Sequence, residues 1–286
     1  MLSCHGDNSQ GFTIWGNWGP FAAANYNMGW HSKGGHDRTF GTNAKAWDWC
    51  SVNNAGFEYY QNAKKDGIGL PPHNPRIWVF RHQSNASCAP KLRRVWHPIG
   101  YSSNSGWSNF FINITAGRLL TYTNTLLKFA LPDIVIGTGG GYNTYDIYES
   151  VNHELSHASH FNKVGSAFWA KYVNYIITYG KKYDHPYGDA SCNNSGFCGV
   201  GEMWGYAMGY IRTYEKYQQK PKNGQSKWFQ PNLLYDLMTE KILTKKQIFD
   251  CLSSDVTSHA LLQQKMISRY PSKKDSIIAK FSRYGF

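Results

Sequence analysis

Residues 133–161 read DIVIGTGGGYNTYDIYESVNHELSHASHF, and this stretch decides the fold. Its start predicts a short strand, Asp133–Ile136, that runs into a glycine-rich segment. A helix is then expected to begin at a cap formed by Asn143 or Thr144 and to reach about Phe161. One face of that helix is apolar and the other polar. The helix is therefore predicted to pack on a core while its polar face lines a cleft. The apolar stripe consists of Ile147, Val151, Leu155 and Ala158.

The polar face carries the pentapeptide His153-Glu154-Leu155-Ser156-His157. Two histidines four residues apart lie one turn apart on the same face, so both imidazoles can reach one metal ion. Glu154 projects about 100° further around the helix, where it can contact a water at the metal. A chance match to this five-residue pattern is expected only about 0.01 times in a chain of this composition. The pattern predicts a zinc site with Glu154 as the general base.

Zinc needs at least a third protein ligand and an open position. His160 shares the histidine face, but the helix from the first histidine to His160 spans about 10.5 Å, which is too far for one metal ion. We expect His160 in the wall of the cleft. Glu202 is the predicted third ligand, in the segment GVGEMWGYAMG at 199–209. Gly205 and Gly209 lie near its face and would let this helix approach the metal helix closely, which gives a reason for helical glycines that cost about 1 kcal/mol.

The pattern YESVNHELSHASHF at 148–161, followed by GVGEMWG at 199–205, resembles the gluzincin branch of the zincin metallopeptidases. It is similar to zinc-dependent peptidases among secreted bacterial proteins, over about residues 130–215. The resemblance implies a zincin-like α+β fold in which the edge strand, Asp133–Ile136, binds extended substrate above the metal helix. It also implies hydrolysis of a peptide or protein substrate with Zn²⁺ as the cofactor.

Gluzincins often carry an aspartate one turn after the third ligand, and this chain has Tyr206 there. Tyr206 is expected either to bond a metal histidine or to donate to the oxyanion formed during hydrolysis. Other candidate oxyanion donors are Tyr187, His185 and Arg212, and the sequence leaves the choice among these four open.

The chain is predicted to form a single catalytic domain, 1–286, of two lobes. The first, about 1–140, is mixed and bears the sheet; the second, 141–286, is mostly helical, and the active-site helix lies at the cleft between them. Strands are predicted at Arg76–His82 and Phe110–Ile114, and helices at Asn54–Lys65 and Arg118–Phe129. Further helices are predicted at Ser166–Tyr179, Gly201–Tyr217, Leu233–Lys241, Lys245–Leu252, Ser258–Ser268 and Asp275–Ser282.

Composition narrows the class of protein. Hydrophobic residues make up 41% of the 286 and charged residues 17%, which is typical of a globular protein. No stretch approaches the roughly 20 apolar residues that cross a bilayer, so no transmembrane segment is expected. The net charge is +12, but its lysines are dispersed and no nucleic-acid motif accompanies them, so nucleic acid is not an expected partner.

Six cysteines are compatible with an exported protein. Cys192 and Cys198 bracket a turn-rich loop that a disulfide can close. Leu2-Ser3-Cys4 weakly resembles the end of a lipoprotein signal. The expected location is therefore secreted, periplasmic or at the cell surface, where the chain can be anchored. The oligomeric state is not predicted.

Two other functions compete with the peptidase. A catalytically silent, zincin-like surface module would bind glycan or protein through the tryptophans of the first half of the chain. A zinc amidase would cleave cell-wall material with the same metal chemistry. The tryptophans are Trp15, Trp18, Trp30, Trp47, Trp49, Trp96 and Trp107.

Overall fold

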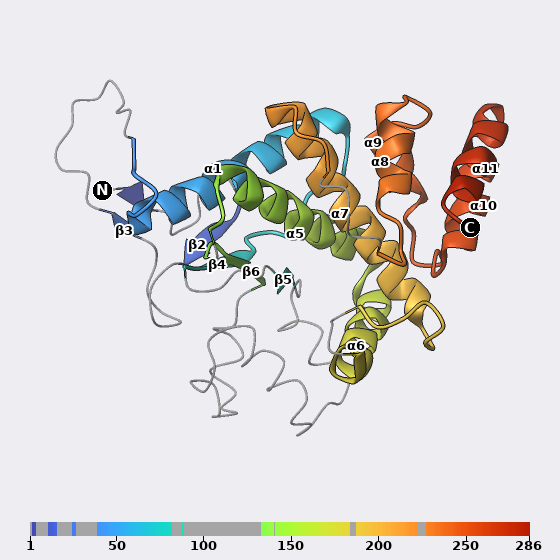
Figure 1. Cartoon of the computed structure of the whole chain (residues 1–286), viewed down its shortest axis with the longest axis horizontal. Coiled ribbons are helices and arrows are strands. Elements are labelled where there is room, and N and C mark those ends of the chain that lie inside the picture. Colours follow the sequence, from blue (N-terminus) through green and yellow to red (C-terminus); the bar gives the residue numbers. More distant parts are fainter. Residues whose placement is uncertain are drawn as a thin grey trace.

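The computed structural model describes residues 2–3, 11–15, 25–26, 39–81, 87–88, 133–139, 141–183, 187–221 and 227–286. These residues form a mixed α/β structure that is mostly helical (Figure 1). The predicted strand Phe110–Ile114 and helix Arg118–Phe129 lie outside the described residues. The same is true of Trp18, Trp30, Trp96 and Trp107.

A small sheet forms in the order β2-β4-β6-β5, where β2 is Thr13–Trp15, β4 Arg76–Phe80, β6 Ile134–Gly137 and β5 Ser87–Cys88. The first three strands are parallel, with Trp15 opposite Trp78 and Trp78 opposite Val135, and β5 is antiparallel to β6. All four residues of β6 are buried, as expected for an interior strand. Both predicted strands that fall on described residues, Arg76–His82 and Asp133–Ile136, are therefore confirmed within two residues.

The position of β6 in the sheet corrects one expectation. β6 was expected to be the edge strand, but it is hydrogen-bonded to β4 on one side and to β5 on the other. The strand outside it, β5, has only two residues and no apolar run that would announce it in the sequence. Two further short strands, β1 (Leu2–Ser3) and β3 (Asn25–Tyr26), pair antiparallel in a separate sheet.

Helix α5 (Thr144–Val164) carries the pentapeptide His153–His157. It begins at a capping box, because the Asn143 side chain accepts from the backbone N–H of Asp146 while Asp146 accepts from the N–H of Asn143. The apolar stripe predicted for this helix is fully buried. Helix α1 (Lys45–Asp66) packs against α5 beside the sheet. It starts nine residues before the predicted helix, and it ends at Gly67, which adopts the left-handed conformation.

Helices α6 (Ser166–Tyr183) and α7 (Ser195–Tyr217) both pack against α5, and α5 and α7 run side by side (Figure 1). α7 begins six residues before the predicted helix, because glycines near its start weaken the helical pattern of the sequence. One of them allows close packing: a Cβ on Gly199 would lie 2.8 Å from Cε1 of His259 and 2.9 Å from Cζ3 of Trp228.

The C-terminal helices lie on the other side of α7 (Figure 1). All of them agree with the predicted helices within two residues. They are α8 (Asn232–Thr239), α9 (Lys245–Cys251), α10 (His259–Arg269) and α11 (Lys274–Arg283), with the 3-10 turn η1 (Pro271–Lys273) before the last.

The main core draws residues from both sides of residue 140, from Ile14 in β2 to Phe281 in α11. Of the tryptophans named above for the surface module, three have described side chains: Trp49 belongs to the main core, Trp47 packs against it and Trp15 is buried. A second cluster lies between α6 and the start of α7. Among the described helices, none is both long and apolar enough to span a membrane.

The cysteines correct a second expectation. Cys192 and Cys198 are both free, so no disulfide closes their loop. α7 already begins at Ser195, which turns the buried Cys198 into the second cluster. Cys50 and Cys251 are also free.

Candidate metal centre

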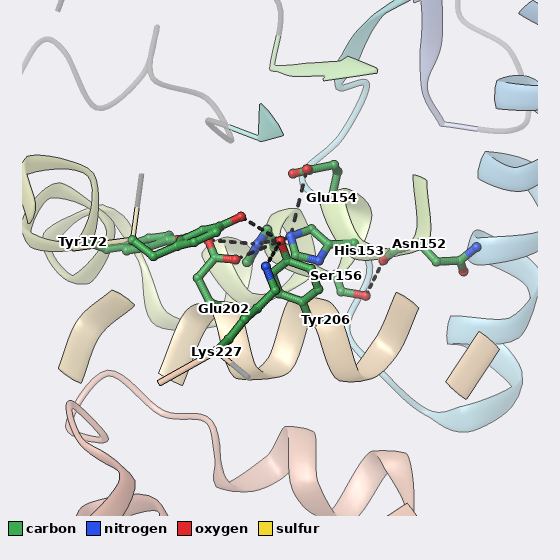
Figure 2. A network of polar contacts seen from close by, with 10 residues as sticks. Asn152, His153, Glu154, Ser156, Tyr172, Glu202, Tyr206 and Lys227 are labelled. Atoms are coloured by element: carbon green, nitrogen blue, oxygen red, sulfur yellow. Dashed lines mark hydrogen bonds and ion pairs between the residues drawn. The ribbon is translucent and has the colours of Figure 1, made fainter. Parts of the chain in front are cut away.

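Two histidines on α5 face α7 and form the centre of the site (Figure 2). The Nε2 atoms of His153 and His157 are 2.9 Å apart, and their rings meet edge to face with centroids 4.5 Å apart. Both side chains are buried. The structure therefore brings both predicted histidine ligands together, as their spacing on one helical face requires.

Glu202 on α7 reaches both histidines with its two carboxylate oxygens. Oε2 is 3.6 Å from Nε2 of His153, and Oε1 is 3.6 Å from Nε2 of His157. The hydroxyl of Tyr172 on α6 donates a hydrogen bond to Oε1 and so fixes the carboxylate. Tyr172 was not singled out from the sequence, because a tyrosine in an amphipathic helix carries no signal of what it contacts.

Close approach of α7 to α5 depends on Gly205. A Cβ at this position would lie 2.6 Å from Cε1 and 2.7 Å from Nε2 of His157, and 3.2 Å from Cε1 of His153. One Cβ on Gly209 would lie 3.1 Å from the carbonyl oxygen of Glu149. The predicted reason for these two glycines is therefore confirmed: they let the helix that carries Glu202 reach the histidines.

Glu154 lies beside the histidine pair rather than between its members. Its Oε1 is 4.0 Å from Nε2 of His153. The side chain is buried, and burial raises the pKa of its carboxyl group well above the usual value, with the negative charge of Glu202 adding to the effect. A carboxylate with a raised pKa is a better proton acceptor.

The donor atoms fit one metal ion. Ligand atoms of His153, Glu154 and His157 lie within 4.8 Å of one another. Two zinc bonds of about 2.0–2.1 Å that meet near the tetrahedral angle join donors about 3.4 Å apart. The separations of 2.9 Å between the histidines and 3.6 Å from each to Glu202 are close to that value. Oε2 of Glu154 and Oε2 of Glu202 are buried without a hydrogen-bond partner among the described residues, as expected of groups that serve a cation.

Tyr206, one turn after Glu202, packs its ring against that of His153 with centroids 4.2 Å apart. Its hydroxyl is 2.8 Å from the hydroxyl of Tyr187 and accepts a hydrogen bond of 3.0 Å from Nζ of Lys227. Burial and the nearby charge of Glu202 raise the pKa of both tyrosines, so both hydroxyls keep their protons. Two of the four candidate oxyanion donors are thus adjacent to the site.

Lys227 is a member of the site that sequence reasoning missed. The sequence before Lys227 has no helical or strand periodicity, so it does not indicate where the side chain lies. Only the folded structure places Lys227 beside Tyr206 of α7. Burial lowers the pKa of its ammonium, while Glu202 and Glu149 partly oppose that shift. The charge of Lys227 also contributes to the lowered pKa of His153, after the larger effects of burial and of His157.

Of the two remaining candidate donors, only Arg212 lies among the described residues. Arg212 is buried in an ion pair with Asp66, with N and O atoms 2.5 Å apart, and in a second pair with Glu215. It is therefore committed elsewhere, and its candidacy was wrong. His185 lies outside the described residues.

His160 is fully buried, against the rings of Phe168 and Trp169. Burial lowers its pKa to about 3. Neither ring nitrogen has a hydrogen-bond partner among the described residues, and the same holds for Nδ1 of His157 and Nε1 of Trp169. The centroids of the His157 and Trp169 rings are 5.6 Å apart, so these unpaired atoms form one group on the α6 side of the site.

A cavity of about 430 Å³ lies at the N-terminal end of α7 rather than at the histidines. Aromatic side chains from distant parts of the chain contribute to its lining, including Phe197, Trp228, His259 and Phe286. The cavity is therefore separate from the cleft that was expected at the metal helix.

Comparisons with protein-family models, with curated proteins and with solved structures give no match to this chain. The interpretation of the site accordingly rests on its residues and their geometry.

Proposed function

We propose that this chain is a zinc-dependent peptidase with His153, His157 and Glu202 as metal ligands and a zincin-like active site. The observation that carries the proposal is the convergence of one buried carboxylate on two imidazoles, at 3.6 Å from each. Two histidines and a glutamate form a ligand set of catalytic zinc sites, which leave one position open. When bound, the ion supplies Lewis acidity that polarises a carbonyl group and acidifies water.

Glu154 is the general base in this proposal. Its carboxylate lies 4.0 Å from His153, beside the ligand atoms and outside the histidine–glutamate triangle. From there it accepts the proton of the attacking water and passes it to the leaving nitrogen. Its raised pKa favours holding that proton between the two steps.

Tyr206 is the proposed oxyanion donor, and the hydroxyl of Tyr187 is hydrogen-bonded to it. Because Lys227 donates to the oxygen of Tyr206, the phenolic proton of Tyr206 stays available to another acceptor. The 2.8 Å contact between the two hydroxyls keeps both oriented beside His153. Preorganised donors of this kind stabilise the developing negative charge of a tetrahedral intermediate.

Zinc content and peptide hydrolysis, measured together, test the proposal. Wild-type protein should hold about one zinc per chain, and Glu202→Ala should lose most of it. Glu154→Gln should keep the zinc and lose hydrolysis of a mixed peptide library by at least about a hundredfold. Glu58→Gln on α1, whose carboxylate pairs with Lys216 away from the histidines, is the control and should change neither.

Two results would contradict the proposal in different ways. Unchanged zinc in Glu202→Ala would remove this residue as a ligand. Full zinc in the wild type without turnover of any peptide would favour the silent binding module, unless cell-wall amides are cleaved, which would favour the amidase.

A further inference from the structure

We infer that the site selects substrates bearing a carboxylate next to the scissile bond, and that Lys227 binds this carboxylate. The inference rests on the proposed function and adds a substrate class to it. Three observations carry it: how Lys227 is held, the charge of the site and the side from which the site is exposed.

Lys227 is a half-buried ammonium held by aromatic rings. Its Nζ lies 4.1 Å from the ring centroid of Tyr206, 5.0 Å from that of Tyr187 and 5.9 Å from that of Phe229. The only hydrogen bond it makes within the described part of the chain goes to the hydroxyl of Tyr206, and no described carboxylate lies within ion-pair distance. An ammonium has three N–H donors, so two remain for a ligand.

Some other lysines of the described chain that are withdrawn from solvent are paired with carboxylates. Lys245 is paired with Asp66 and Glu215, and Lys280 with Asp236 and Glu240. A desolvated charge is costly unless it is paired. Lys227 lacks a carboxylate partner within the described residues. Lys163 lacks one too, but its ammonium donates to the backbone carbonyl of Phe249 and lies outside the site, whereas Lys227 lies beside the histidines.

The charge of the loaded site favours an anion. The site contains two carboxylates, those of Glu154 and Glu202, and one ammonium, that of Lys227. Figure 2 shows all three groups around His153. A divalent ion would balance the two glutamates, so the ammonium of Lys227 would be opposed only by the charge of Glu149, which does not form an ion pair with it. A substrate carboxylate bound to Lys227 would neutralise the charge of the ammonium. It would also accept the hydrogen bonds that the ammonium made to water before burial.

Exposure places Lys227 where a substrate enters. On the α6 side, His160, Phe168 and Trp169 are at most 2% exposed, and this side is closed. Tyr206, Tyr187 and Lys227 are only half-buried. A substrate that approaches the histidines from the more accessible side therefore passes the ammonium and the two tyrosine hydroxyls.

The experiment measures peptide binding to zinc-loaded Glu154→Gln protein, in which hydrolysis is blocked. Three pools of one tripeptide library are used: free C-termini with neutral side chains, amidated C-termini with neutral side chains, and amidated C-termini with one Asp or Glu. Bound peptides are separated by ultrafiltration and quantified by mass spectrometry. The same pools are applied to Lys227→Met and Lys163→Met in the Glu154→Gln background.

We expect the carboxylate-bearing pools to bind about ten- to a hundredfold more tightly than the neutral amides, as a charge-assisted hydrogen bond provides. Lys227→Met should abolish this preference. Lys163→Met should retain it, since Lys163 is also a half-buried ammonium over an aromatic ring, that of Phe249, but lies outside the site. Preference for free C-termini would identify a terminal carboxylate, and preference for the acidic amides a side-chain carboxylate.

Equal binding of the carboxylate and amide pools would overturn the inference. A preference that survives Lys227→Met would also overturn it, because the metal ion alone would then account for the anion. Hydrolysis by the wild type is measured separately. A preference for carboxylate peptides without any cleavage would contradict only the proposed function. Equal cleavage of free and amidated peptides would contradict only the inference.

Discussion

The two sides of the histidine pair differ in how their polar atoms are satisfied. On the α7 side, Glu202, Tyr206 and Lys227 form a connected group of charges and hydrogen bonds around the ring of His153. On the α6 side, the ring nitrogens of His160 and the indole N–H of Trp169 are buried and have no partner among the described residues.

This difference separates two tasks of a metal site. The α7 side provides Glu202, the proposed third ligand, and the groups proposed to contact a substrate. The α6 side surrounds the His157 ring with those of Trp169 and Tyr172. A ligating histidine usually donates its second ring N–H to a nearby acceptor, and a water bound among these groups can accept from Nδ1 of His157 and donate to one ring nitrogen of His160.

The largest effect on the metal is expected from Gly205→Ala, which acts on the α7 side. The new Cβ would lie 2.6 Å from a ring atom of His157, so ring or helix must move. We expect zinc affinity to fall by more than about a hundredfold, beyond the 10- to 100-fold typical of changes behind the ligands. Competition with a chromogenic chelator measures it.

Gly201→Ala is the matched control on the same helix, since its Cβ would make ordinary contact with Tyr172 at 3.6 Å. It should leave zinc affinity unchanged and raise the free energy of unfolding by up to about 1 kcal/mol. If both alanines affected zinc equally, close approach at Gly205 would not be what shapes the site.

A smaller effect is expected from His160→Leu on the α6 side. The variant removes the polar ring through which a bound water can hold Nδ1 of His157, and zinc affinity should then fall by about 10- to 100-fold. His160→Asn keeps an acceptor and should recover part of that loss. The ¹⁵N shifts of the His157 ring should change in His160→Leu, which a purely structural role would not require. Zinc affinity within twofold of the wild type in His160→Leu would exclude a positioning role.

The smallest effect on zinc affinity is expected from a substitution of His259, which lies on neither side of the His153–His157 pair. It stacks on Phe286 with centroids 4.0 Å apart, and burial lowers its pKa to about 4. Between this value and about 6.5 the unfolded state binds more protons than the folded state, so stability falls as the pH falls through this window.

At pH 5 the cost of keeping His259 neutral in the folded chain is about 2 kcal/mol. His259→Phe should remove this loss in urea unfolding at pH 5 compared with pH 7.5, with zinc affinity at pH 7.5 unchanged. If wild type and variant lost the same free energy of unfolding at pH 5, another group would cause the acid sensitivity. If the variant bound zinc more weakly, His259 would contribute to the metal site.

Much of the local structure followed from the sequence. The helices after residue 140 have clear 3.6-residue periodicity, and their observed bounds agree closely with prediction except at the start of α7 and the end of α6. The exception at α7 has a physical cause: glycines weaken the local helical signal, while their close contacts with His259 and the histidine pair stabilise the helix only in the folded chain. β5 escaped prediction for a similar reason, because two residues carry no period and their pairing partner lies far along the chain.

The candidate site divides in the same way. The sequence by itself determined that His153 and His157 share a helical face and that Glu154 lies beside them, since one turn of helix fixes those relations. Only the tertiary structure decided that Tyr172 holds Glu202, that Arg212 is committed to Asp66 and that Lys227 faces the histidines. These contacts join elements that are far apart in the chain, and the packing of α5 against α6 and α7, rather than any local spacing, sets their distances.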